Sequence, residues 1–129
     1  MPRLTALVCS ISMALLTGCA ALREPNEVAW QAMHAIDTAQ TLSLTRDSRY
    51  VEVESAWLLG ERPKEKAVVA WSVASSFAHA GITRLLIDND HPKAAKIWQY
   101  VTLSSVCSTV GRNASIGIQI GGTNAGPDR

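Results

Sequence analysis

The chain has 129 residues, of which 47% are hydrophobic and 18% are charged, and its formal net charge is +1. This length accommodates one domain, and the ordinary apolar content argues against a disordered chain or a fibrous repeat. Because 12 Lys and Arg are balanced by 11 Asp and Glu, the chain lacks the basic stripe that phosphate binding requires, and no nucleic acid partner is expected.

Residues 1–18 have the pattern of a secretory signal peptide, in which Arg3 precedes a mostly apolar stretch that is too short to cross a bilayer permanently. The stretch ends in Leu16-Thr17-Gly18-Cys19, which resembles the lipobox of bacterial lipoproteins. That resemblance implies cleavage before Cys19, a diacylglyceryl group on its thiol and acylation of its amine. Each buried CH2 group contributes roughly 0.8 kcal/mol, so several acyl chains make a stable anchor.

Removal of the signal peptide changes the cysteine content of the chain. Cys9 would leave with the signal and Cys19 would carry lipid, so Cys107 remains without an intramolecular disulfide partner. We expect Cys107 to be a small buried apolar residue and not a nucleophile, because no His lies near it in the sequence. The covalent lipid is the only cofactor expected. By resemblance to Gram-negative lipoproteins, Ala20 in place of Asp implies transport to the outer membrane, at its periplasmic face.

The mature chain is expected to comprise a lipidated tether over residues 19–26, a single helical domain over 27–120 and a flexible tail over 121–129. Pro25 and Asn26 form a helix-start signal, which predicts a first helix from about 27 to 44. Steps of 100° per residue make this helix amphipathic. Its apolar side carries Val28, Ala32, Ala35, Ile36 and Ala39, and its polar stripe carries Trp30, His34, Asp37 and Thr41.

Residues 45–63 interrupt this periodicity and are predicted to form an ordered loop. Two further helices are predicted over about 64–87 and 92–112, with the polar, Pro-containing residues 88–92 forming a tight turn between them. Helices joined by so short a turn form an antiparallel hairpin. The predicted fold is therefore all-α, a small three-helix bundle that contains this hairpin.

Residues 67–83 contain no charged side chain, so a hairpin embedded in the membrane must be weighed against a bundle beside it. Arg84 follows directly, and lysines flank both ends of the hairpin without the asymmetry that orients a spanning pair. The helix is also amphipathic and not apolar all round, so we favour the bundle beside the membrane. Its polar stripe carries Ser72, Ser76, His79 and Thr83, and its apolar stripe carries Ala70, Ala74, Phe77, Ala78, Gly81 and Leu85.

Several short patterns in the mature chain are similar to those of a group of small, uncharacterised helical bacterial proteins, many of them membrane-associated. The group reads Asn-Pro where this chain has Ala56-Trp57. The sequence therefore does not decide whether this chain forms the rigid turn that Pro would impose. The resemblance implies a helical organisation and no known reaction, substrate or cofactor. The patterns are Asp37-Thr38-Ala39-Gln40-Thr41, Glu54 followed by Leu58-Leu59-Gly60 and Pro63, His79, and Asn113 with Ile116-Gly117.

A polar cluster is predicted from His34, Asp37 and His79, joined by Gln40 and Asn113. A His beside a carboxylate can bind a metal or act as a general base. Two His and one Asp fall short of a tetrahedral zinc site, and the chain has neither His-Glu-x-x-His nor Cys-x-x-Cys spacing. We therefore expect the cluster to join helices through hydrogen bonds, with no catalytic and no metal-binding residue.

Two functions follow from these patterns. The favoured one is a lipid-anchored small helical protein of the bacterial cell envelope with a structural or protein-interaction role. Its partners would be the membrane, through the lipid on Cys19, and an envelope protein. The alternative is a small envelope hydrolase or metal-binding protein that uses His34, Asp37 and His79.

Overall fold

The computed structural model describes residues 24–47, 49–53, 55–118 and 120. The predicted signal peptide, Cys19 and the predicted tail over 121–129 lie outside these residues. Every regular element in the described part of the chain is a helix, which confirms the predicted all-α fold class. The elements are α2 (Pro25–Thr45), α3 (Ala56–Leu59), α4 (Glu65–Asp88) and α5 (Pro92–Ser115).

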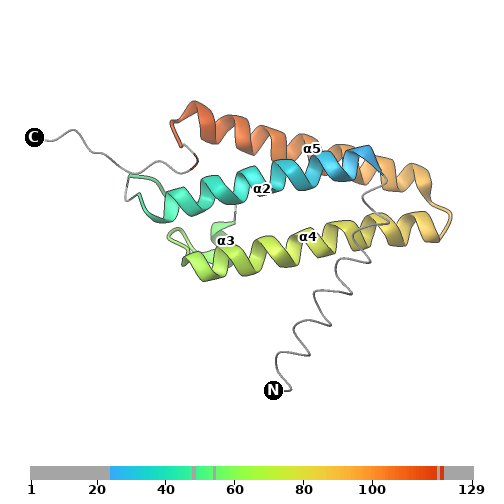
Figure 1. Ribbon diagram of the computed structural model, residues 1–129, viewed down its shortest axis with the longest axis horizontal. Coiled ribbons are helices and arrows are strands. Elements are labelled where there is room, and N and C mark those ends of the chain that lie inside the picture. The colour runs from blue at the N-terminus through green and yellow to red at the C-terminus, as the bar shows by residue number, and fades with distance from the viewer. Residues whose placement is uncertain (1–23, 48, 54, 119, 121–129) are drawn as a thin grey trace, which may run out of the picture.

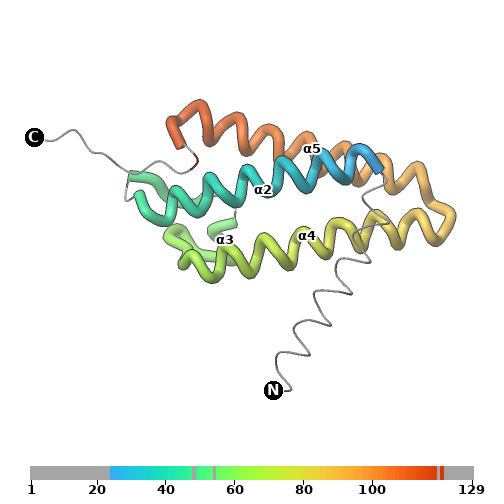
Figure 2. The backbone as a smooth tube through the Cα atoms, in the orientation of Figure 1, coloured from blue at the N-terminus to red at the C-terminus, as the bar shows by residue number. Residues whose placement is uncertain are grey.

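The three long helices form one bundle. Helices α4 and α5 run antiparallel as a hairpin, and α2 packs against both of its arms (Figure 1). The tube in Figure 2 shows that α2 runs opposite to α4 and in the same direction as α5. The short helix α3 and the segments around it lie at the end of the bundle opposite the hairpin turn.

The helices begin and end close to the predicted boundaries. Helix α2 begins at Pro25, two residues earlier than predicted, because the fixed φ of Pro and its missing N–H suit the first helical position. Helix α5 continues three residues beyond the predicted end at 112. The predicted loop 45–63 contains the helical turn α3, which ends at Gly60 with a positive φ of 82°.

The hairpin turn comprises residues 89–91. Asp90 adopts a φ of 62°, a left-handed conformation that the short polar side chain of Asp tolerates. The backbone N–H of His91 donates to the carbonyl oxygen of Leu86 at 2.8 Å. Pro92 then begins α5, as the predicted turn over residues 88–92 required.

Helices α2 and α4 direct their polar stripes toward the interior of the bundle. In a water-exposed bundle the apolar stripe of a helix usually faces the core. Here the buried residues of α2 include Glu27, His34, Gln40 and Thr41, and those of α4 include His79 and Thr83. Many apolar side chains of the same helices lie outside, among them Val28, Val69, Val73, Phe77 and Leu85, which are 43–62% exposed.

The buried apolar set is correspondingly small within the described residues: Trp30, Leu44, Val68, Ala95, Val106 and Ile118. Cys107 is exposed on α5, so its predicted burial is wrong. It lies on the outer side of α5, whereas Val106 beside it faces the bundle.

The outer surface between the two ends of the bundle carries no charge. The acidic residues within α2 are Glu27 and Asp37, and both take part in contacts between helices. Residues 67–83 and 97–111 contain no charged side chain. A helical segment of this length extends for about 25 Å at 1.5 Å per residue. No helix in the described part of the chain combines the length and the hydropathy needed to span a bilayer.

Candidate functional site

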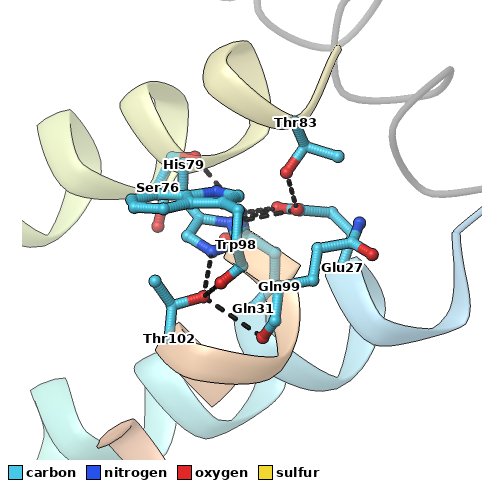
Figure 3. Close-up of polar contacts among 8 residues, drawn as sticks. All are labelled: Glu27, Gln31, Ser76, His79, Thr83, Trp98, Gln99 and Thr102. Atoms are coloured by element: carbon cyan, nitrogen blue, oxygen red, sulfur yellow. Dashed lines mark hydrogen bonds and ion pairs between the residues drawn. The ribbon is translucent and has the colours of Figure 1, made fainter. Parts of the chain in front are cut away.

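A buried ion pair joins α2 to α4 at the centre of a polar network (Figure 3). The Nδ1 atom of His79 lies 2.9 Å from Oε2 and 3.0 Å from Oε1 of Glu27. Thr83 donates its hydroxyl to Oε2 at 2.8 Å, and Gln31 donates its amide to Oε1 at 2.8 Å. Both carboxylate oxygens are therefore hydrogen-bonded, which a buried carboxylate requires.

The second ring nitrogen of His79 contacts α5. Its Nε2 atom lies 2.7 Å from the hydroxyl oxygen of Thr102. That hydroxyl can donate its single hydrogen to the backbone carbonyl of Trp98 at 2.8 Å. Through its two ring nitrogens, His79 therefore links Glu27 of α2 to Thr102 of α5.

Two tryptophan rings stack with the His79 ring. The ring of Trp30 stacks on that of His79 with a centroid separation of 3.7 Å, and the ring of Trp98 lies 5.0 Å away. The His79 ring thus contacts a carboxylate through Nδ1 and stacks with two indole rings.

The order of contacts Thr102, His79, Glu27 is the same as in hydrolases that use a hydroxyl nucleophile. A nucleophile of that kind must donate its proton to the histidine. Here the hydroxyl of Thr102 is also placed to donate to the carbonyl of Trp98 at 2.8 Å, so its proton has a competing acceptor. The arrangement favours a structural role for these three residues.

The carboxyl of Glu27 is held in its ionised form. Burial by itself raises its pKa, but the hydrogen bonds from His79, Gln31 and Thr83 and the charge of His79 lower it more, so the pKa lies below the usual value. The ionised carboxylate is the form that accepts all three hydrogen bonds.

His34 is the second buried histidine, and it contacts α4 nearer the α3 end. Its Nε2 atom donates to the carbonyl of Ser72 at 3.2 Å and lies 2.8 Å from the hydroxyl of Ser75. Burial lowers the pKa of His34, and the charge of His79 lowers it further, against the opposite effect of the bond to Ser72. His34 is therefore a neutral ring in the folded protein at neutral pH.

The predicted polar cluster is distributed along the bundle and does not meet at one point. His79 pairs with Glu27, and His34 contacts Ser72 and Ser75. Asp37 and Gln40 instead share Asn113 of α5, whose amide nitrogen lies 3.4 Å from Oδ1 of Asp37 and 3.3 Å from Oε1 of Gln40. Among the described residues, no three His, Cys, Asp or Glu side chains are placed to hold a metal ion.

Sequence reasoning did not identify Glu27 or Thr102 as members of the network. Glu27 is the first residue of the predicted helix 27–44, a position where an acidic side chain interacts favourably with the helix dipole. Its position one helical turn before Trp30 and two before His34 was the available signal, because residues at this spacing share a face. For Thr102 no signal existed, since its position opposite His79 depends on the packing of α4 against α5.

Two buried nitrogen atoms next to the pair have no hydrogen-bond partner within the described part of the chain: Nε1 of Trp98 and Nε2 of Gln99. Gln99 extends from α5 in the same close-up as Glu27 and His79 (Figure 3), and it is only 1% exposed. An unpaired buried amide costs free energy.

Two hollows adjoin the network. A cavity of about 280 Å³ with a half-polar, half-apolar lining lies at the α3 end, lined by residues of α2, α4, α5, the segment 50–59 and the residues just after α5. A mostly apolar groove of about 490 Å³ runs between α4 and α5 over Trp30 of α2. Four side chains line both spaces: His34, Asp37, Trp71 and Thr109.

Comparison with protein families, with curated proteins and with solved structures found no match to this chain. The function must therefore be argued from the geometry of the chain itself.

Proposed function

We propose that this chain is a lipid-anchored protein of the bacterial cell envelope with a structural role, and that its helical bundle lies against the apolar part of the bilayer. The observation that carries the proposal is the reversed polarity of α2 and α4 between their ends: Glu27, His34, His79 and Thr83 are buried, whereas many of the apolar side chains, such as Val28, Val73 and Phe77, are exposed.

The reversed polarity has an energetic consequence. Apolar surface left in water costs roughly 25 cal/mol per Å², and Val69, Val73 and Phe77 on α4 are 48–50% exposed. Contiguous exposed apolar surface marks a site of contact with a membrane or another protein. Contact with acyl chains removes this cost without requiring complementary charges on the partner.

The interior of the bundle suits the same surroundings. Where water is absent, polar groups must be paired within the protein. The Glu27 carboxylate and both ring nitrogens of His79 are hydrogen-bonded in this way. The lipid predicted on Cys19 would hold the bundle at the membrane surface, so no single helix needs to span the bilayer.

The proposal is tested by spin labels on the full, lipid-modified protein in membranes. In a Cys107→Ser background, labels are introduced at Ala32 and Val73 on the outer faces of α2 and α4, and at Lys66 and Lys93 near the ends of the bundle as matched controls. Accessibility to oxygen, which partitions into lipid, is compared with accessibility to a water-soluble nickel complex.

Labels at Ala32 and Val73 are expected to be more accessible to oxygen, and labels at Lys66 and Lys93 more accessible to nickel. Equal preference for nickel at all four positions would overturn the proposal. Protection from both reagents at Ala32 and Val73 would also overturn lipid contact and would indicate a protein partner on that surface instead.

The alternative function, a hydrolase or metal-binding protein that uses His34, Asp37 and His79, has no specific observation in its favour. The three side chains bind different partners along α2.

A further inference from the structure

The cavity at the α3 end and the apolar groove share four lining side chains, and we infer that the two spaces are continuous and together form a binding site for a single-chain amphiphile with a neutral, hydroxyl-bearing head group. The head would occupy the cavity, and the acyl chain would lie in the groove between α4 and α5. This site goes beyond the proposed function and does not depend on contact between the outer faces and the bilayer.

The cavity provides hydrogen-bonding groups from several elements. Its polar lining includes Thr38 and Thr41 of α2, Ser72 of α4 and Asn113 of α5. These side chains present hydroxyl and amide groups that both donate and accept hydrogen bonds. Binding pockets for small molecules commonly combine an apolar surface with a few such polar groups.

The charges that line the cavity select against an anionic head. Asp37 and Glu52 contribute two carboxylates, whereas Arg112 contributes one guanidinium. His34 adds no positive charge at neutral pH, because burial lowers its pKa. A carboxylate or phosphate head would meet a net negative lining, whereas a glycerol-type head meets donors and acceptors without this repulsion.

The groove provides the apolar half of the site. Its walls are formed by Ala74, Ala78 and Ile82 of α4 and by Val106 of α5, with Trp30 at its base. It follows α4 from Trp71 to Ile82, a length of about 16 Å at 1.5 Å per residue. Its volume of about 490 Å³ lies within the range of ligand pockets, roughly 300–1,000 Å³.

The junction of the two spaces fixes the polarity of the ligand. Trp71 and Thr109 line both the cavity and the groove. The cavity exposes polar and apolar lining in equal measure, whereas the lining of the groove is mostly apolar. A purely polar ligand would leave the groove empty, and a hydrocarbon would leave the cavity groups without new partners, so an amphiphile fits both.

The test uses the full lipid-modified protein in phosphatidylcholine vesicles and a 1-lauroylglycerol that carries a photoactivatable diazirine in its acyl chain. The labelled residues are mapped by mass spectrometry. We expect labelling on the groove-lining parts of α4 and α5, and competition by unlabelled 1-lauroylglycerol. Laurate, which has the same chain and an anionic head, should compete about tenfold less well, equivalent to about 1.4 kcal/mol.

Two substitutions on α4 provide a matched pair. Ala74→Phe fills the groove, whereas Ala70→Phe places the same side chain one turn away, on an exposed position that lines neither space. Labelling should be lost in Ala74→Phe and kept in Ala70→Phe. Ser105→Leu, which narrows the groove from α5, should repeat the loss, and circular dichroism shows that each variant is folded.

Three results would overturn the site. Labelling over the outer faces of the bundle that excess 1-lauroylglycerol does not reduce would indicate adsorption of an adventitious amphiphile only. Equal labelling of Ala74→Phe and Ala70→Phe would exclude the groove. Competition by laurate as strong as that by 1-lauroylglycerol would exclude the preference for a neutral head. None of these results decides the spin-label experiment, so the site and the proposed function can fail separately.

Discussion

Glu27 and His79 lie 52 residues apart in the sequence and form an ion pair whose side chains are only 1% and 3% exposed. The pair ties the first turn of α2 to the middle of α4, and Thr102 extends the connection to α5. In a bundle with few buried apolar side chains, these polar contacts determine which faces of the three helices meet.

Removing the carboxylate from this pair should destabilise the protein strongly. Glu27→Gln keeps the size of the side chain but removes the carboxylate from the buried pair with His79, and a loss of about 3–5 kcal/mol in the free energy of unfolding is expected. Urea denaturation followed by circular dichroism measures it. Glu65→Gln, which removes the partner of Arg46 in an exposed ion pair, should be indistinguishable from the parent protein. A similar small effect for both variants would contradict the assignment.

The stability that Glu27 contributes should depend on pH in one direction. Its pKa is lowered in the folded protein by its hydrogen bonds and by His79, against the opposing effect of burial. A lowered carboxyl pKa contributes stability that is fully present above the unfolded pKa, near 4.5, and is lost as the pH falls through the folded value. The difference in unfolding free energy between the parent and Glu27→Gln should therefore shrink in acid below about pH 4.5. A constant difference would show that ionisation of Glu27 is not involved.

The stability contributed by His34 should also fall as the pH is lowered, but in a higher pH range than for Glu27. Burial lowers the pKa of His34 below the ordinary 6.5, so the folded protein disfavours the protonated ring. The stability contributed by the neutral ring is fully present above the unfolded pKa, about 6.5, and is lost as the pH falls through the lower pKa of the folded protein. In His34→Gln, the fall in unfolding free energy between neutral pH and about pH 5 should be shallower than in the parent protein. Denaturation curves at a series of pH values measure both slopes.

Replacing Gln99 by an apolar residue should not reduce the stability of the protein. The amide nitrogen of Gln99 is buried without a partner in the described structure, so replacing the side chain by one of similar shape removes an unpaired polar group. Gln99→Met should leave the melting temperature unchanged or raise it. A loss of stability comparable to that of Glu27→Gln would mean that the amide is paired after all, for instance through an ordered water.

The lipid anchor is tested at Cys19. A protein expressed with its own N-terminus in a Gram-negative host should incorporate labelled palmitate and fractionate with membranes, and Cys19→Ala should lose the label. Mass spectrometry of the mature N-terminus checks the cleavage site. Retention of label by Cys19→Ala, or a mature chain that begins at another residue, would contradict the lipobox assignment.

Asp37 should contribute to packing and not to metal binding. Its carboxylate accepts a hydrogen bond from Asn113 across α2 and α5, and Asp37→Ala should lower the free energy of unfolding by about 1–3 kcal/mol. Purified protein should contain no stoichiometric metal by elemental analysis. One equivalent of zinc that is lost in folded His34→Ala and His79→Ala variants would reverse this prediction.

The sequence by itself determined the helical class and most of the helix boundaries. These depend on local signals, such as Pro25 and Pro92 at helix starts and the polar turn at 89–91, which act within a few residues. The amphipathic periodicity of α2 and α4 could also be recognised from the sequence, because it repeats every 3.6 residues within one segment of the chain.

Only the tertiary structure decided which stripe of each helix faces inward. Periodicity defines two sides of a helix but not which of them is buried, and the usual expectation places the apolar side inside. Here the buried side is the polar one, because Glu27 of α2, His79 of α4 and Thr102 of α5 satisfy one another when the helices pack. The partners in such a network are separated by dozens of residues, so no local pattern could have placed them together.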